Sequence, residues 1–78
     1  MNVWFLNKIG NWCSTKLTRA TLCTVFETEK GYWKFVSEGE FSEDEYDTSE
    51  EARNAAENYY GVRKGWPFKE VKNDLDSL

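Results

Sequence analysis

Residues 31–61 constrain the fold of this chain more than any other stretch, because they hold its clearest turn signals and its clearest helix signal. Gly31 and Gly39 each end a short polar sequence, Glu-Lys-Gly and Glu-Gly. Glycine at such positions is typical of the turns in β-hairpins. A helix start and a helix stop follow in the segment TSEEARNAAENYYG. The stretch therefore predicts a hairpin that leads into a helix.

The predicted helix runs from Thr48 to Tyr60. Thr48 and Glu51 have the spacing of a capping box, in which the hydroxyl accepts a hydrogen bond from the Glu51 N–H and the carboxylate reaches back to the helix start. Gly61 suits the position after the last helical residue. One face is apolar and predicted to pack on a sheet; it comprises Ala52, Ala55, Ala56 and Tyr59. The side predicted to face water comprises Arg53, Asn54, Glu57 and Asn58.

Alternating apolar and polar residues predict three strands of a meander before this helix, at residues 21–28, 32–37 and 40–46. The last of these is apolar only near its ends, so we expect it at an edge of the sheet. The predicted fold class is therefore α+β: a small antiparallel β-sheet of three to five strands, with one helix packed on one face.

The two ends of the chain, residues 1–20 and 62–78, suit more than one structure. In the first segment, β-branched and aromatic residues favour strands at residues 3–6 and within residues 12–18. In the second, Pro67 can open a short helix, or the segment can form a brief strand. A competing amphipathic helix in the first segment would use the helical spacing of Phe5, Ile9, Trp12 and Lys16.

The length of 78 residues predicts a single domain, residues 1–78, with a small core. Its four Trp, four Tyr and five Phe are more than such a core requires, so we expect some of them on the surface, where aromatic rings favour binding. The sequence has no signal-peptide pattern and no apolar stretch of membrane-spanning length, which predicts a cytoplasmic protein. Cys13 and Cys23 are accordingly predicted to be reduced and buried.

The residue types argue against catalysis. The chain has no histidine, the commonest general base and metal ligand. Two cysteines are too few for a zinc site, and the acidic run lacks the glycine and the spacing of a calcium-binding EF-hand loop. No glycine-rich phosphate loop is present either. We therefore predict a non-enzymatic protein with no cofactor, no metal and no small-molecule substrate.

The charge distribution indicates a binding surface. The net charge is −4, but residues 27–57 alone carry eleven acids and three bases. Acids at every second position of the predicted edge strand would project from one face about 6.6 Å apart, which can imitate a phosphate backbone. The predicted partner-binding residues are Glu38, Glu40, Glu43, Asp44, Glu45, Tyr46, Asp47, Glu50 and Glu51.

The predicted function is inhibition of a protein partner that has a basic, nucleic-acid-handling surface. A negative surface steers such a partner toward the protein and repels nucleic acid and anionic membrane. The plan of aromatic hairpin, acidic turn and capped alanine helix is similar to that of small phage-encoded proteins that disable host machinery. An anti-defence or host-takeover role would fit this plan, although no motif carries a residue role over.

Two alternatives stay open. The acids can protect the edge of the sheet and keep a small protein soluble. Alternatively, the chain can bind nucleic acid through basic residues of the N-terminal segment and of residues 62–72, with an exposed tryptophan as a stacking platform. That surface would comprise Lys8, Lys16, Arg19, Arg63, Lys64 and Lys69, with Trp12 or Trp66.

Overall fold

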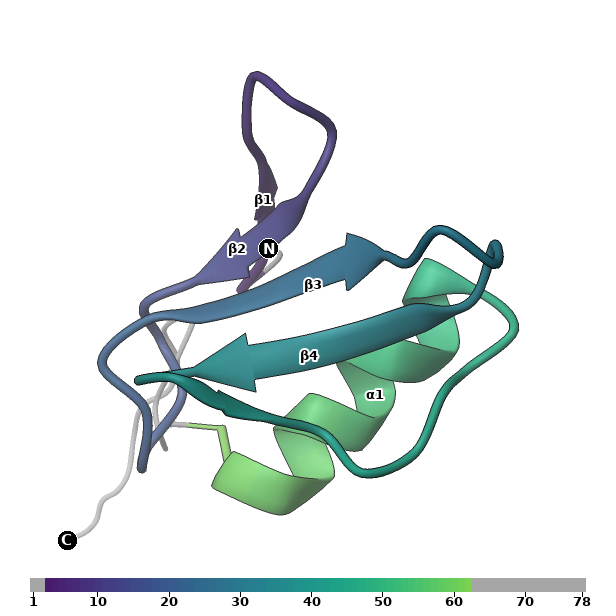
Figure 1. Ribbon diagram of the computed structural model, residues 1–78. Helices are drawn as coiled ribbons and strands as arrows, with labels where there is room; N and C mark the ends of the chain where they lie inside the picture. The colour runs from purple at the N-terminus through teal and green to yellow at the C-terminus, as the bar shows by residue number, and fades with distance from the viewer. Residues whose placement is uncertain (1–2, 63–78) are drawn as a thin grey trace, which may run out of the picture.

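The computed structural model describes residues 3–62, which form a five-stranded antiparallel sheet with one helix across one face (Figure 1). Each strand pairs with the next along the chain, so the sheet is a meander. The predicted α+β class is confirmed, whereas the predictions for residues 63–78, including a helix or strand after Pro67, lie outside the described residues. The elements are β1 (Phe5–Leu6), β2 (Trp12–Ser14), β3 (Cys23–Glu27), β4 (Trp33–Ser37), β5 (Glu40–Phe41) and α1 (Ser49–Tyr60).

The N-terminal segment forms the hairpin β1–β2, so the competing helix is wrong. Gly10 has a φ of 90°, which a helix does not allow. The side chain of Asn7 organises the loop, because its Oδ1 accepts hydrogen bonds from the N–H groups of Ile9 (3.1 Å) and Asn11 (2.9 Å). This local bonding satisfies backbone groups that a helix would otherwise pair.

The turn between β4 and β5 consists of only two residues. Ser37 pairs with Glu40, and the residues between them are Glu38 (φ 54°) and Gly39 (φ 83°). Positive φ at both positions is the type I′ pattern, which suits the twist of a hairpin. Glycine adopts this conformation freely, but a glutamate side chain is strained in it, so the turn stores strain at Glu38.

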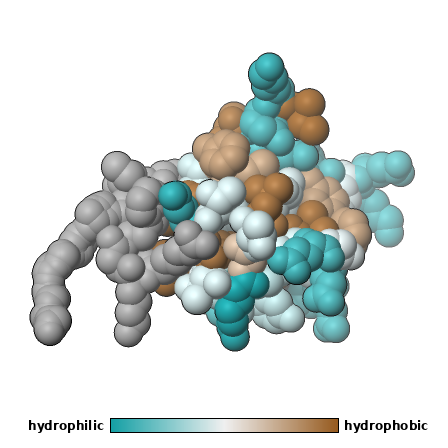
Figure 2. Space-filling model, turned by 90° about the vertical axis from the view of Figure 1, so that its left-hand side faces the viewer, coloured by the Kyte–Doolittle hydropathy of each residue, from teal (hydrophilic) through white to brown (hydrophobic). Residues whose placement is uncertain are grey.

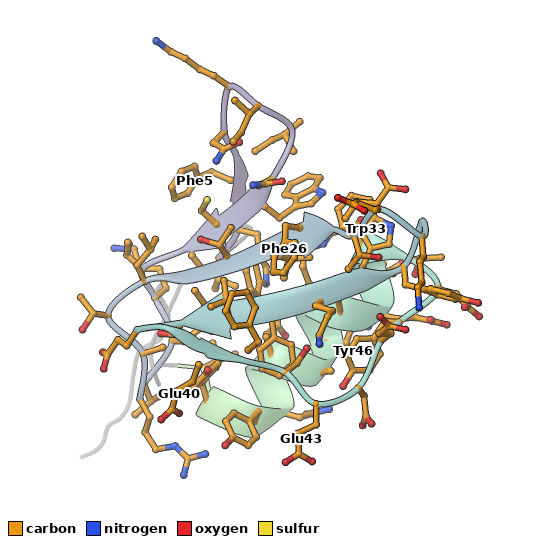
Figure 3. All side chains as sticks on the ribbon, viewed as in Figure 1. Phe5, Phe26, Trp33, Glu40, Glu43 and Tyr46 are labelled. Carbon is orange, nitrogen blue, oxygen red and sulfur yellow. The ribbon has the colours of Figure 1, made fainter. Side chains whose placement is uncertain are left out.

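The strand register sorts side chains onto two faces of the sheet. On the side of α1, Val25 lies opposite Phe35, and both side chains are buried. On the other side, Phe26 projects away from α1 (Figure 3) and packs edge-to-face on Phe41, with ring centroids 5.8 Å apart. A row of side chains crosses all five strands on this open side: Phe5, Cys13, Thr24, Val36 and Phe41.

The helix approaches β3 and β4 closely because small residues face them. Ala52 and Ala56 are fully buried and Tyr60 is 9% exposed, whereas Tyr59 is 62% exposed. Tyr60 therefore takes the core position that the prediction gave to Tyr59. Because α1 crosses the strands obliquely (Figure 1), the side that contacts the sheet moves around the helix along its length and reaches Tyr60 at the last turn.

Two residues assigned to the wet side of the helix instead connect it to the N-terminal part of the chain. The guanidinium of Arg53 lies over the ring of Trp12, 4.1 Å from its centroid. The indole Nε1 of Trp4 donates a hydrogen bond of 2.7 Å to Glu57 Oε2. The prediction of a fully solvated side is wrong for both helix residues, because each has an aromatic partner within reach.

The end of the helix is tied to the segment between β2 and β3. Gly61 has a φ of 83°, as expected of the residue after a helix, and its carbonyl accepts a hydrogen bond of 2.7 Å from the Thr18 N–H. Arg19 donates from Nε to the Tyr60 carbonyl (3.2 Å) and from its terminal guanidinium nitrogen to the Tyr59 carbonyl. A cation at this position also offsets the negative end of the helix dipole.

Candidate partner-binding site

The edge of the sheet that carries the acids contains a bulge. β5 pairs with β4 as far as Phe41, opposite Val36, and pairing resumes only at Tyr46, opposite Trp33. Residues 42–45 therefore face only two residues of β4, so this border holds two extra residues. The predicted edge strand is interrupted after its second residue, and its prediction as one continuous strand is wrong.

Ser42 holds the bulge in place because its hydroxyl substitutes for a backbone carbonyl. The Phe35 N–H donates to Ser42 Oγ (3.2 Å), and the same hydroxyl donates to the Asp44 carbonyl (3.0 Å). The Ser42 N–H donates to the Phe35 carbonyl at 2.7 Å. A buried N–H without an acceptor costs about 1–3 kcal/mol. The hydroxyl allows the chain to leave the ladder without that loss.

The bulge removes the regular spacing predicted for the acids. Glu43, Asp44 and Glu45 are all exposed, but they follow a bend and not a strand, so their carboxylates do not project at every second position. The acids still follow one border of the molecule, from the β4–β5 turn to the start of α1, and Figure 3 shows Glu40 and Glu43 along it. We call this border the acidic edge; it comprises Glu38, Glu40, Glu43, Asp44, Glu45, Asp47, Glu50 and Glu51.

Most of the acidic edge has no partner within residues 3–62. Glu38 Oε2 accepts a hydrogen bond from Thr21 Oγ1 (3.2 Å), and Glu51 Oε1 accepts one from the Asp47 N–H (3.2 Å). These carboxylates repel one another, and cations of the described chain do not neutralise them, so the edge attracts cations from outside. The carboxylates with no hydrogen bond or ion pair to the described residues are those of Glu40, Glu43, Asp44, Glu45, Asp47 and Glu50.

The start of α1 matches the predicted capping box in one of its two bonds. The Glu51 N–H donates to Thr48 Oγ1 at 3.1 Å, which confirms the first. The Glu51 carboxylate accepts a hydrogen bond from the Asp47 N–H and not from the Thr48 N–H. The second bond of the capping box therefore reaches one residue further toward the N-terminus than in the standard pattern. Thr48 has an extended backbone (φ −132°, ψ 158°), which leaves the preceding N–H within reach of the carboxylate.

A hollow of about 550 Å³ lies between the bulge and the C-terminal half of α1. We call it the edge pocket. Its aromatic wall is a cluster around Phe35, whose ring centroid lies 6.3 Å from that of Tyr46, 5.9 Å from that of Tyr59 and 5.8 Å from that of Tyr60. Tyr46, which was predicted to contact a partner, is therefore half-buried in the pocket wall.

Three residues of the acidic edge also line the edge pocket: Glu40, Glu43 and Asp44. Burial, followed by the charge of Asp44, raises the pKa of Tyr46. Burial is also the main cause that raises the pKa of Tyr60, and the charge of Glu40 adds to it. Both phenols are therefore neutral at neutral pH, and the negative potential of the carboxylates extends over the aromatic wall.

Cys13 and Cys23 are both unpaired and buried, which agrees with the prediction. Burial raises the pKa of the Cys23 thiol from 9.0 to about 12, so the reactive thiolate is not populated at neutral pH. Residues 3–62 contain no group of three or more side chains suited to hold a metal ion. In the same part of the chain, no helix has the length and the apolar character needed to cross a membrane.

The residues proposed for nucleic-acid binding do not form one surface in the described part of the chain. Lys8 is exposed in the β1–β2 loop, whereas Arg19 lies beside the end of α1 and binds its carbonyls. Trp12 is half-buried beneath Arg53, so its ring is not a free stacking platform. Lys16 is half-buried in the segment between β2 and β3, and the other members of that set, Arg63, Lys64, Lys69 and Trp66, lie outside the described residues.

The chain matches no protein-family model, no curated protein and no solved structure. Its function is therefore argued from the geometry of the acidic edge and the edge pocket. Sequence reasoning missed the pocket residues Phe35, Tyr59 and Tyr60. One signal for them is the adjacent pair of tyrosines at the end of α1, because neighbouring helical residues lie about 100° apart and one of the two is expected at the margin of the buried face.

Proposed function

We propose that this protein is a non-enzymatic binding module that inhibits a protein partner with a basic, nucleic-acid-handling surface. The acidic edge would supply the contact and occupy the groove in which the partner holds a phosphate backbone. Such an inhibitor would suit an anti-defence or host-takeover role of the phage type.

The observation that carries the proposal is the set of carboxylates without intramolecular partners. A carboxylate that serves the fold is expected to accept hydrogen bonds or to pair with a cation, as Glu57 does with Trp4. Most acids of the edge do neither within residues 3–62. Negative charges along a border can displace the counterions of a cationic groove, as a nucleic acid does.

The test is to identify a partner and to measure its association rate. Tagged protein is used to capture partners from lysate of the native host at low and at high salt. The on-rate of the captured protein is then measured for wild type and for the double variant Glu43→Lys/Glu45→Lys. We expect the variant to associate at least about tenfold more slowly at low salt, because electrostatic steering accounts for such factors. The difference should shrink as salt rises.

The matched control is Glu27→Lys/Glu29→Lys, which reverses two exposed acids of the β3–β4 hairpin, outside the acidic edge. The control should associate nearly as fast as wild type. Equal slowing by both double variants would mean that only net charge matters, which contradicts a specific acidic edge. If the captured partner is nucleic acid, and the Glu43→Lys/Glu45→Lys variant binds it more tightly than wild type, the nucleic-acid alternative replaces the proposal.

A further inference from the structure

The edge pocket combines two features that together select one kind of side chain. The first is an exposed ring: Tyr59 contacts Phe35 and, edge-to-face at 4.9 Å between centroids, Tyr60, yet it is 62% exposed. Leaving a large ring in water beside a hollow is typical of binding positions, where tyrosine supplies much contact area.

The second feature is unbalanced negative charge. Glu40, Glu43 and Asp44 line the pocket and have no ion pair with the described residues. Arg19 is near, in an adjoining hollow that it shares with Glu40 and Tyr59, but it donates to the carbonyls at the end of α1. The pocket is therefore lined by three acidic residues and by aromatic rings.

The protein itself contains an example of the contact that such a pocket favours. The Arg53 guanidinium lies over the Trp12 ring, 4.1 Å from its centroid, on the side of the sheet that α1 covers. A cation over an aromatic face is attracted by the negative potential of the ring, and the attraction grows as water is excluded. The edge pocket has the ring and the charge for the same contact without the guanidinium.

We propose that the edge pocket receives an arginine side chain of the partner, with the guanidinium stacked on Tyr59 and paired with the carboxylates of the pocket. This inference rests on the proposed function and adds the specific contact by which the acidic edge recognises a basic partner. A volume of about 550 Å³ is large enough for a side chain of this size, since pockets for small molecules span about 300–1,000 Å³.

Arginine fits better than lysine for a geometric reason. The guanidinium is planar, so it can stack on a ring while the N–H groups in its plane bind a carboxylate in a bidentate way. The lysine ammonium is compact and strongly hydrated, so entering the pocket costs it more hydration and gives it no stacking contact. A neutral side chain of the same shape gains neither the pairing nor the cation–π attraction.

The test uses three short synthetic peptides with blocked ends, in which glycine alternates with arginine, with lysine or with citrulline. Citrulline has nearly the shape of arginine but no charge. Each peptide is titrated into ¹⁵N-labelled protein at low salt, and the chemical shifts and dissociation constants are measured by NMR. We expect the arginine peptide to bind most tightly and to shift the resonances of Tyr59, Tyr46 and Asp44, while the citrulline peptide shifts none of them.

Tyr59→Ala should weaken binding of the arginine peptide by about three- to tenfold, the range expected for a cation–π contact. Tyr59→Phe keeps the ring and should bind like wild type. The matched control is Tyr32→Ala, which removes a tyrosine that is 42% exposed on the β3–β4 hairpin and should leave binding unchanged. The isosteric pair Glu43→Gln/Asp44→Asn keeps the packing and should weaken binding as well.

Two results would overturn the pocket inference and leave the proposed function intact. One is equal affinity of the arginine peptide for wild type and Tyr59→Ala. The other is binding that shifts resonances at Asp47 and Glu50 but none in the pocket. A lysine peptide that binds as tightly as the arginine peptide would overturn the choice of arginine. The proposed function fails separately, if the protein partner captured from lysate associates equally fast with wild type and Glu43→Lys/Glu45→Lys.

Discussion

The two edges of the sheet differ in charge, although each has to avoid pairing with the edge strand of another molecule. Both end in strands of only two residues, β1 and β5, which limits the unpaired backbone that each edge exposes. The β1 edge is apolar: Phe5 is 53%, Leu6 56% and Ile9 79% exposed. Viewed from the left-hand side of Figure 1, hydrophobic surface lies beside and below the hydrophilic tip of the β1–β2 hairpin at the top (Figure 2). The β5 edge instead carries the acids, the bulge and the pocket.

This difference bears on why the acids are present. If a short strand needed a row of carboxylates for protection, the β1 edge would be expected to carry one too. It has no acid, and the nearest charge in its loop is Lys8. Short length and a side-chain-bonded loop protect the β1 edge, and the bulge alone could do the same for β5. The contrast favours a binding role for the acidic edge over simple edge protection.

The largest expected effect tests whether both edges depend on one core. Ala56 is fully buried against the sheet, so Ala56→Glu should destabilise the protein by more than about 4 kcal/mol and unfold it. Asn54→Glu, on the exposed side of α1, should change stability by less than about 0.5 kcal/mol. Circular dichroism and NMR of both variants check this. A folded β1–β2 hairpin in Ala56→Glu would mean that the two edges are independent units.

The next effect is a loss of stability at alkaline pH that originates at Cys23, in the central strand β3. Because burial raises the folded pKa of Cys23 from 9.0 to about 12, folding favours the protonated thiol. The protonated thiol therefore contributes its full stabilisation below pH 9. Between pH 9 and about 12 the free energy of unfolding falls, by at most about 1.4 kcal/mol per pH unit. Urea titrations at several alkaline pH values should show this slope.

Cys23→Ala is the control for that titration. Its stability should fall less steeply with pH, with a remaining slope from Tyr46 and Tyr60, whose pKa values are also raised. Equal slopes in wild type and Cys23→Ala would contradict the role of the thiol. Loss of the β5 edge signals before those of β1 would show that the alkaline transition starts in the tyrosine cluster and not in the shared core.

A smaller loss of stability is expected when the side chains that organise the two edges are removed one at a time. Ser42→Ala should cost about 1–3 kcal/mol, because it leaves the buried Phe35 N–H without its acceptor. Asn7→Ala removes the corresponding bonds of the β1–β2 loop, but those lie nearer to solvent, so water can replace them and the loss should be about 1 kcal/mol or less. Denaturant midpoints give both values. The reverse ranking would contradict the buried bulge.

The smallest effect on stability concerns charge at the edges. Glu45→Gln and Leu6→Gln both replace exposed side chains and should each change stability by less than about 0.5 kcal/mol. Light scattering at rising protein concentration is the decisive measurement. We expect neither variant to aggregate. If Glu45→Gln aggregates, the acids protect the edge, and the contrast between the two edges loses its functional meaning.

The fold was predictable because its local signals are strong and agree with one another. Alternation marked β3 and β4, and Gly31, Thr48 and Gly61 marked turn and helix ends, all of which the structure confirms. The strand order was predictable as well, because each strand of a meander pairs with its neighbour along the chain. The choice between Tyr59 and Tyr60 was not predictable in this way. Both fit a helical stripe, and the oblique crossing of α1 over the sheet decides between them.

The candidate site was predictable in composition but not in shape. The acids were visible as a run without bases, but their alternation predicted a regular strand. The bulge depends on one hydroxyl, Ser42, taking the place of a carbonyl, and a serine in an acidic sequence gives no sign of that. The edge pocket then follows from the bulge and from a helix that is distant in sequence, so the adjacent tyrosines indicate an exposed ring but no local pattern reveals the hollow.

The hydrogen bond between Trp4 and Glu57 has a consequence for the order in which the molecule assembles. It joins residues 53 positions apart, whereas the ladders of the meander join neighbours. On the ribosome, the first hairpin emerges early but its anchor is made last, so its docking must wait for α1. Contacts of such long separation close late and slow folding. Until then the Trp4 side chain, which is only 5% exposed in the folded protein, remains uncovered on the nascent chain, which makes the segment around it suited to chaperone capture.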